Sequence, residues 1–175
     1  AYIFGQNKEH PTFLIGRDTR RSGTMLADIL AAGIASAGGD CYMAGVIPTP
    51  AIAYLTRTHH MDAGVMISAS HNPFEYNGIK FFDGFGYKLP DETEDKIEEC
   101  MLKDERAALQ SRPTGAAIGT ISAWTDLQQE YADFICKSTD IDLSGLKVVH
   151  DGANGSASLL GPEILERLGA EVIAI

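Results

Sequence analysis

The chain has 175 residues and a formal net charge of −10, and 45% of its residues are hydrophobic. This hydrophobic content excludes a disordered chain, and no apolar run approaches the roughly 18 residues that a membrane-spanning helix needs. The excess of acidic over basic residues argues against non-specific binding to nucleic acid or to an anionic membrane.

Cysteine usage and the N-terminal residues indicate the compartment. The chain starts with no basic and apolar leader of the kind that directs secretion. Its cysteines, Cys41, Cys100 and Cys136, are far apart and form no CxxC or Cys/His pattern. Such cysteines are typical of a reducing compartment and argue against a structural zinc site. We therefore expect a cytoplasmic α/β protein.

Short β-like runs alternate with helix-like stretches in the first part of the chain. The expected strands occupy residues 13–16, 41–46, 64–68 and 78–82. Between the first two, Ser22 is a plausible N-cap of a helix that the glycines at 38 and 39 end. The predicted apolar face of this helix consists of Leu26, Ile29, Leu30, Gly33, Ile34 and Ala37.

Two more helices are expected before residue 104. The prolines at 48 and 50 precede a helix at 51–58. An acidic helix begins at Pro90, where its carboxylates suit the positive end of the helix dipole. Its residues predicted to face the core are Ile97, Met101 and Leu102.

The remaining chain predicts a connection and then a second, smaller unit. Residues 104–121 contain Pro113, Gly115 and Gly119 and are predicted to be a loop, followed by a helix at 123–137 that carries the only tryptophan. After a linker at 138–145, the expected elements are a strand at 146–150, a helix at 158–168 and a strand at 170–175. Two strands and one helix are marginal on their own. We therefore expect an α/β domain at 1–140 and the beginning of a second α/β domain at 145–175.

The stretch with the clearest chemical character follows the third expected strand. Ser70 lies at the exposed carboxyl end of that strand, where open α/β sheets commonly bind ligands, and the Asn72-Pro73 pair forces a turn just after it. Ser70 could be a nucleophile or a phosphate carrier, with Lys80 offsetting the phosphate charge. The residues alone leave a second interpretation open, in which Ser70 is only a turn or capping residue.

Four stretches together resemble the α-D-phosphohexomutase family. Residues 67–74 (ISASHNPF) with 77–82 (NGIKFF) are similar to the phosphoserine loop of that family. Three further stretches match in order: 16–23 (GRDTRRSG), 48–54 (PTPAIAY) and 151–155 (DGANG). The Ser-Ala-Ser sequence before His-Asn-Pro most resembles the family members that act on amino sugars.

The resemblance implies a first domain with a mixed sheet between helices, and it implies a phosphoserine mechanism. Ser70 would carry a phosphate and pass it to glucosamine 6-phosphate, a hexosamine phosphate, giving a hexose 1,6-bisphosphate intermediate and then glucosamine 1-phosphate. A Mg²⁺ ion would bind the phosphate oxygen on Ser70. Two alternatives stay open: a phosphomannomutase or phosphoglucomutase of the same fold, and a module that only binds sugar phosphates.

The resemblance also assigns roles to the neighbours of Ser70. Lys80 is expected to be a cation near the transferring phosphate, and His71 a second catalytic candidate. Arg20 and Asn72 are candidates for binding substrate or phosphate. For Arg20, a loop-organising role and a salt bridge with Asp18 are competing interpretations. Ser68 is the nearest competitor of Ser70 for the phosphate. His59 and His60 are expected to be surface residues without a ligand.

Some parts of the family pattern have no counterpart here. Residues 1–7 do not contain the family's opening strand with its active-site arginine. The 175 residues also show no counterpart of the aspartate-rich magnesium loop, the sugar-selecting loop or the last phosphate-binding domain. Asp151-Gly152 stands where the amino-sugar enzymes more often have Asp-Cys. We expect the 175 residues to be inactive by themselves. A homodimer is a further expectation.

Overall fold

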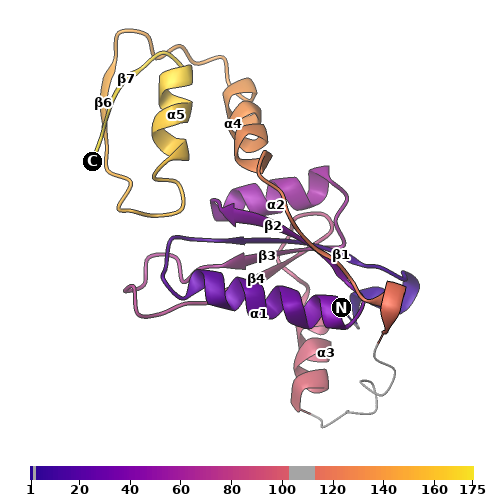
Figure 1. Cartoon of the computed structure of the whole chain (residues 1–175). Helices are drawn as coiled ribbons and strands as arrows, with labels where there is room; N and C mark the ends of the chain where they lie inside the picture. Colours follow the sequence, from indigo (N-terminus) through magenta and orange to yellow (C-terminus); the bar gives the residue numbers. More distant parts are fainter. Residues whose placement is uncertain (2, 103–112) are drawn as a thin grey trace.

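The structure is a computed structural model that describes residues 1, 3–102 and 113–175 (Figure 1). A main sheet of five strands has the order β4-β3-β1-β2-β5. Its strands are β1 (Thr12–Arg17), β2 (Asp40–Val46), β3 (Ala63–Ile67), β4 (Ile79–Asp83) and β5 (Ile121–Ala123). All neighbours pair in parallel except β4, which runs antiparallel to β3, so the sheet is mixed. The four strands predicted in this region are confirmed.

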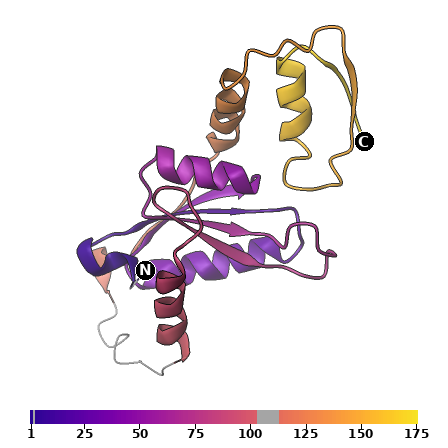
Figure 2. The same ribbon diagram turned by 180° about the vertical axis from the view of Figure 1, so that it is seen from behind.

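Helices α1 (Gly23–Ser36) and α2 (Thr49–Thr58) lie on opposite faces of the sheet (Figures 1 and 2). Successive side chains of a strand point to opposite faces. In β1, Phe13 therefore packs in the hydrophobic cluster beneath α1, while Leu14 packs in the cluster beneath α2. This arrangement confirms the expected α/β class, with a mixed sheet between helices.

A two-stranded sheet forms a second unit. Strands β6 (Lys147–His150) and β7 (Glu171–Ala174) are parallel, and α5 (Leu160–Arg167) connects them. Helix α4 (Leu127–Lys137) lies between α2 and this unit (Figure 2). Among the described residues, no helix is long and apolar enough to cross a membrane.

The prediction for the buried face of α1 is wrong in part. Its buried residues are Gly23, Ala27, Ala31, Ile34 and Ala35. Ile29, which was expected in the core, is 63% exposed. Small residues let the helix backbone approach the sheet closely, so the helix turns its alanines inward. Ser22 also makes no side-chain cap, and its hydroxyl instead accepts a hydrogen bond from Asn77.

The prediction for the acidic helix is also wrong in its packing. Helix α3 (Asp91–Leu102) begins where expected but has no buried residue. Met101 and Leu102 are 78% and 83% exposed. Figure 1 shows α3 projecting from the sheet, which explains why its apolar residues do not reach the core.

The segment predicted as a loop at 104–121 contains structure in its described part. A short 3-10 helix (Gly115–Ala117) precedes β5, and β5 pairs with β2 at the edge of the main sheet. Residues 103–112 lie outside the described residues. Because β5 occupies residues up to 123, α4 starts only at Leu127, and Trp124 precedes the helix. The Trp124 ring packs at 4.5 Å from that of His59.

Candidate functional site

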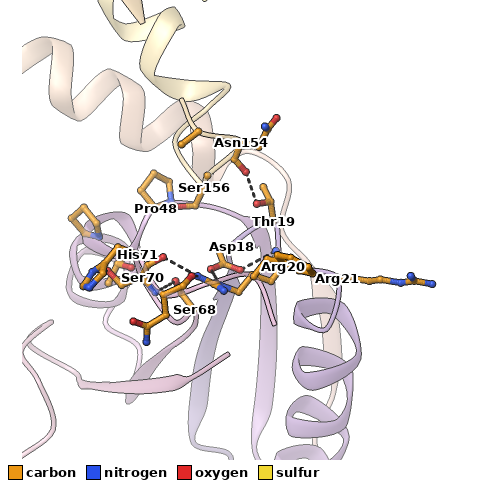
Figure 3. Close-up of a pocket in the computed structure, with 16 residues that line it drawn as sticks. Asp18, Thr19, Arg20, Arg21, Pro48, Ser68, Ser70, His71, Asn154 and Ser156 are labelled. Carbon is orange, nitrogen blue, oxygen red and sulfur yellow. Dashed lines mark hydrogen bonds and ion pairs between the residues drawn. The ribbon is translucent and has the colours of Figure 1, made fainter. Parts of the chain in front are cut away.

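A pocket of about 820 Å³ opens where β1 and β3 end (Figure 3). The backbone N–H of Asp18 donates a 3.0 Å hydrogen bond to the carbonyl of Ile67, which holds the two strand ends together. The loops that follow these strands therefore lie side by side. The residues lining the pocket come from four segments: 18–21, 48–50, 68–74 except 69 and 73, and 153–156. The stretches 16–23, 48–54, 67–74 and 151–155, which carry the family resemblance, thus all contribute to one pocket, whereas 77–82 does not.

Ser70 is exposed in this pocket and has a left-handed backbone, with a φ of 57°. A non-glycine residue pays of order 1 kcal/mol or more for this conformation, and such strain is concentrated at functional sites. Its N–H donates a 3.0 Å hydrogen bond to the hydroxyl of Ser68, and its own Oγ lies 3.5 Å from Nδ1 of His71. Ser68 is buried. Of the two serines, Ser70 is the accessible one.

The guanidinium of Arg20 is the centre of the loop that holds Ser70. Its Nε donates to Asp18 at 2.9 Å, within a pair whose two side chains are each 9% exposed. Its two terminal nitrogens donate to four backbone carbonyls of the loop, those of Ser70, Asn72, Pro73 and Tyr76, at 2.7 to 2.9 Å. The geometry therefore favours the loop-organising interpretation, together with the ion pair to Asp18.

A second set of hydrogen bonds fixes the other end of this loop. The Nδ2 of Asn77 donates to the hydroxyl of Ser22 at the start of α1, at 3.0 Å. The Oδ1 of the same residue accepts from the N–H of Gly78 at 2.8 Å. The N–H of Ser68 donates to the carbonyl of Gly78 at 2.9 Å, which closes the loop at its base. The loop is thus held by two side chains that precede α1, those of Arg20 and Ser22, and by the bond between its own two ends.

The second unit closes one side of the pocket with the loop after β6. Thr19 donates a 2.5 Å hydrogen bond to the carbonyl of Asn154. Ala153 and Asn154 both have left-handed backbones, with φ values of 45° and 50°. The Oδ1 of Asp151 accepts from the N–H of Ala153 at 2.8 Å, which stabilises this turn. Figure 3 shows Asn154 and Ser156 above the pocket, opposite Ser70 and His71.

The predicted site residues are brought together only in part. Ser70, His71, Asn72 and Arg20 all line the pocket. Lys80 does not: it is exposed on β4, paired with Met66. It makes no ion pair with any residue that the structure describes. Its role near a phosphate stays a prediction.

The predictions for His59 and His60 differ in outcome. His60 is exposed, as expected. His59 is only half-buried at the end of α2, and its Nε2 lies 2.8 Å from a carboxylate oxygen of Glu130. This contact links α2 to α4, and neither His59 nor Glu130 lines the pocket.

Thr19, Phe74 and Asn154 are among the pocket residues to which the sequence analysis gives no role. Phe74 is 80% exposed at the edge of the pocket. All three belong to stretches that match the family, which was the signal available for finding them. Thr19 and Asn154 are 135 positions apart in the sequence, so neither stretch alone could predict that they make a contact.

The sequence was compared with protein families and with known proteins. The family described as phosphoglucomutase/phosphomannomutase, alpha/beta/alpha domain I, matches residues 1–108. The chain is 51% identical to a phosphoglucosamine mutase of Desulforamulus reducens over 175 residues, covering all of this chain and 39% of the relative. It is 56% identical to one of Symbiobacterium thermophilum over 162 residues, covering 93% of this chain and 36% of the relative.

A solved structure has the same fold. A phosphoglucomutase/phosphomannomutase family protein of Burkholderia thailandensis superposes with a TM-score of 0.78 at 27% identity, covering 99% of this chain and 38% of the other. The chain spans well under half the length of all three of these proteins. On the family match and these likenesses together, the chain belongs to the phosphoglucomutase/phosphomannomutase family.

Proposed function

We propose that this chain carries the phosphoserine of a mutase that interconverts glucosamine 6-phosphate and glucosamine 1-phosphate. The observation that carries the proposal is Ser70, an exposed serine with a strained backbone that lines a large pocket and is held by the side chains of Arg20 and Ser68. The names of the relatives that are 51% and 56% identical support the amino-sugar substrate.

The reaction needs two transfers at one serine. The free hydroxyl of glucosamine 6-phosphate attacks the phosphorus on Ser70, the bond from phosphorus to Oγ breaks, and the 1,6-bisphosphate forms. The bisphosphate then presents its 6-phosphate, Oγ of Ser70 attacks that phosphorus, and glucosamine 1-phosphate leaves. Such transfers depend mainly on positioning and on neutralising charge. A rigid serine in an open pocket is suited to both transfers.

Protons must move with each transfer. His71 is our candidate for carrying a proton to and from Ser70, because its Nδ1 lies 3.5 Å from Oγ. Asn72, exposed beside it, is a candidate for binding the sugar phosphate. Lys80 would have to turn toward the pocket from β4 to serve as a cation there.

Mg²⁺ would bind the phosphate oxygen on Ser70 and offset its charge. The described residues contain no group of three His, Cys, Asp or Glu side chains that could hold a metal ion. The carboxylate that lines the pocket, Asp18, is already paired with Arg20. We therefore propose that the described residues supply one ligand, the phosphate oxygen on Ser70, and that the other ligands lie beyond the end of the 175 residues.

Further expectations from the sequence belong to the same proposal. We place a domain boundary between residues 140 and 145, which the separate sheets on either side support. We also keep the expectations of a cytoplasmic location and of a homodimer, which fractionation and sedimentation can test. The 175 residues alone are expected to show no turnover, since they span well under half the length of the relatives they match.

The test is turnover by the full-length protein on glucosamine 6-phosphate and on glucose and mannose 6-phosphates, compared as kcat/KM. We expect a preference of about tenfold or more for the amino sugar, which corresponds to about 1.4 kcal/mol. A preference for glucose or mannose phosphate would move the protein to the phosphoglucomutases or phosphomannomutases and keep Ser70. Binding without any turnover would leave a sugar-phosphate-binding module.

A further inference from the structure

We infer that Arg20, together with Asp18, is a positioning residue that holds the Ser70 loop in its active shape, and that it is not a ligand of the substrate phosphate. The inference concerns the same site as the proposed function and rests on it for the activity measurements. The structural measurement below is independent of that function.

All the N–H donors of the Arg20 guanidinium are already used within the protein. A guanidinium has five N–H groups and no acceptor. In Arg20, one N–H is directed to Asp18 and four to the carbonyls of Ser70, Asn72, Pro73 and Tyr76. No donor of Arg20 is left for a phosphate. To bind one, the side chain would have to give up a hydrogen bond that it already makes.

Without Arg20, the four backbone carbonyls would lose the donor that they share. They all point at one planar cation, so removing the charge leaves several partial negative charges facing each other and without partners. Hydrogen bonds from a charged donor contribute more to stability than those between neutral groups, so their loss favours another loop conformation. The loop would relax to satisfy these carbonyls, and the left-handed φ of 57° at Ser70 would be the first strain to be released.

Asp18 fixes the position of the guanidinium relative to the sheet. Its Oδ2 accepts from Nε of Arg20 at 2.9 Å, and its Oδ1 accepts from the backbone N–H of Arg20 at 3.0 Å. Asp18 is buried and is itself hydrogen-bonded through its N–H to Ile67 at the end of β3. Asp18 and Arg20 thereby tie the position of Ser70 to strands β1 and β3, so that it does not depend on the exposed loop alone.

The matched variants are Arg20→Lys, Asp18→Asn and, as a control, Arg57→Lys on the exposed surface of α2. Lysine keeps the charge but offers three donors from a single nitrogen, so it cannot span five acceptors. A phosphate-binding role would be partly rescued by Arg20→Lys, whereas a positioning role would not.

Hydrogen exchange of the loop amides gives the first readout in the full-length protein. The amides of Ser70, Asn72 and Tyr76 donate within the loop and report on its shape. We expect them to exchange about tenfold faster or more in Arg20→Lys, as for the loss of hydrogen bonds from a charged donor. Asp18→Asn keeps a side-chain oxygen and should give a smaller increase in the same segment. The amides of β1 and β3 and the Arg57→Lys control should be unchanged.

Steady-state kinetics gives the second readout. We expect kcat of Arg20→Lys to fall by about tenfold or more while KM for the sugar phosphate stays within about threefold, because an interaction that shapes the reacting group is lost and ground-state binding is kept. Unchanged exchange in both Arg20→Lys and Asp18→Asn would overturn the inference. So would a large rise of KM with kcat and exchange unchanged. Should the wild-type protein show no turnover, the proposed function fails while the exchange comparison still decides the inference.

Discussion

The hydroxyl of Thr19 donates a 2.5 Å hydrogen bond to the carbonyl of Asn154, and the two residues follow strands of different sheets. Thr19 follows β1 of the main sheet, and Asn154 follows β6 of the second unit. Both strands end at the same pocket, so this contact closes its side wall (Figure 3).

Replacing Thr19 by valine should loosen this wall without changing the core. The variant keeps the shape of the side chain and removes the donor, and a neutral hydrogen bond contributes about 1 kcal/mol, or about a fivefold change in an opening equilibrium. We expect amides of the 152–158 segment to exchange about fivefold faster in Thr19→Val. Thr19→Ser, which keeps the hydroxyl, is the control, and equal exchange in the two variants would show that the contact does not hold the loop.

Gly86 allows the turn after β4 to pack against α2. It has a φ of 82°, and an added Cβ would lie 2.3 Å from the carbonyl oxygen of Ala53. Gly45 also has a positive φ, 71°, but an added Cβ there would meet nothing within 4 Å. We expect Gly86→Ala to lower the free energy of unfolding by about 2 to 4 kcal/mol, from backbone strain and overpacking together. Gly45→Ala should cost only the strain, about 1 kcal/mol.

Urea denaturation of the two variants measures these costs. The comparison separates the two effects because both glycines share the left-handed backbone and only Gly86 is crowded. Similar losses in both variants would mean that the contact between the turn and α2 yields without cost.

Asp40 should make folding stability depend on pH in the acid range. The backbone N–H of Thr120, and with it the Thr120 hydroxyl, donate to Oδ1 at 2.7 and 2.8 Å and hold the pKa of Asp40 below its ordinary value. A lowered folded pKa means that the stabilisation is fully present above the unfolded pKa of about 3.9 and is lost as the pH falls through the folded value.

Asp40→Asn removes this dependence. We expect the urea midpoints of wild type and Asp40→Asn to differ most at about pH 6 and to approach each other as the pH falls below about 3.9, since the carboxylate of the unfolded state is then protonated and the stabilisation from the ionised form is progressively lost. A difference that stays constant across this range would mean that the charge of Asp40 does not contribute.

The sequence predicts the buried strands well because their apolar runs are short, continuous and bounded by turn residues. β1 and β3 are buried along almost their whole length, so nothing competes with that pattern. In α1, by contrast, the large residues Met25 and Ile29 point to solvent and the alanines face the sheet. A hydrophobicity pattern predicts that isoleucine is buried in preference to alanine. Close packing of the helix on the sheet instead favours small side chains at the contact.

The candidate site divides in the same way. Ser70 could be found because a serine before an Asn-Pro turn at a strand end has a local chemical meaning. The hydrogen bonds of Arg20 could not be found, because its acceptors lie 50 to 56 positions away and are backbone atoms that carry no side-chain signature. β5 was missed for a related reason: a strand of three exposed residues gains its stability from the sheet edge it joins.

The most direct test of the account is to locate the phosphate on the full-length protein and to measure turnover of Ser70→Ala. Ser36→Ala, an exposed serine at the far end of α1, is the control. We predict phosphate on the peptide that contains Ser70, a loss of turnover by about a thousandfold or more in Ser70→Ala, and no loss in the control. Phosphate on Ser68, or turnover retained by Ser70→Ala, would contradict the assignment of Ser70 as the carrier.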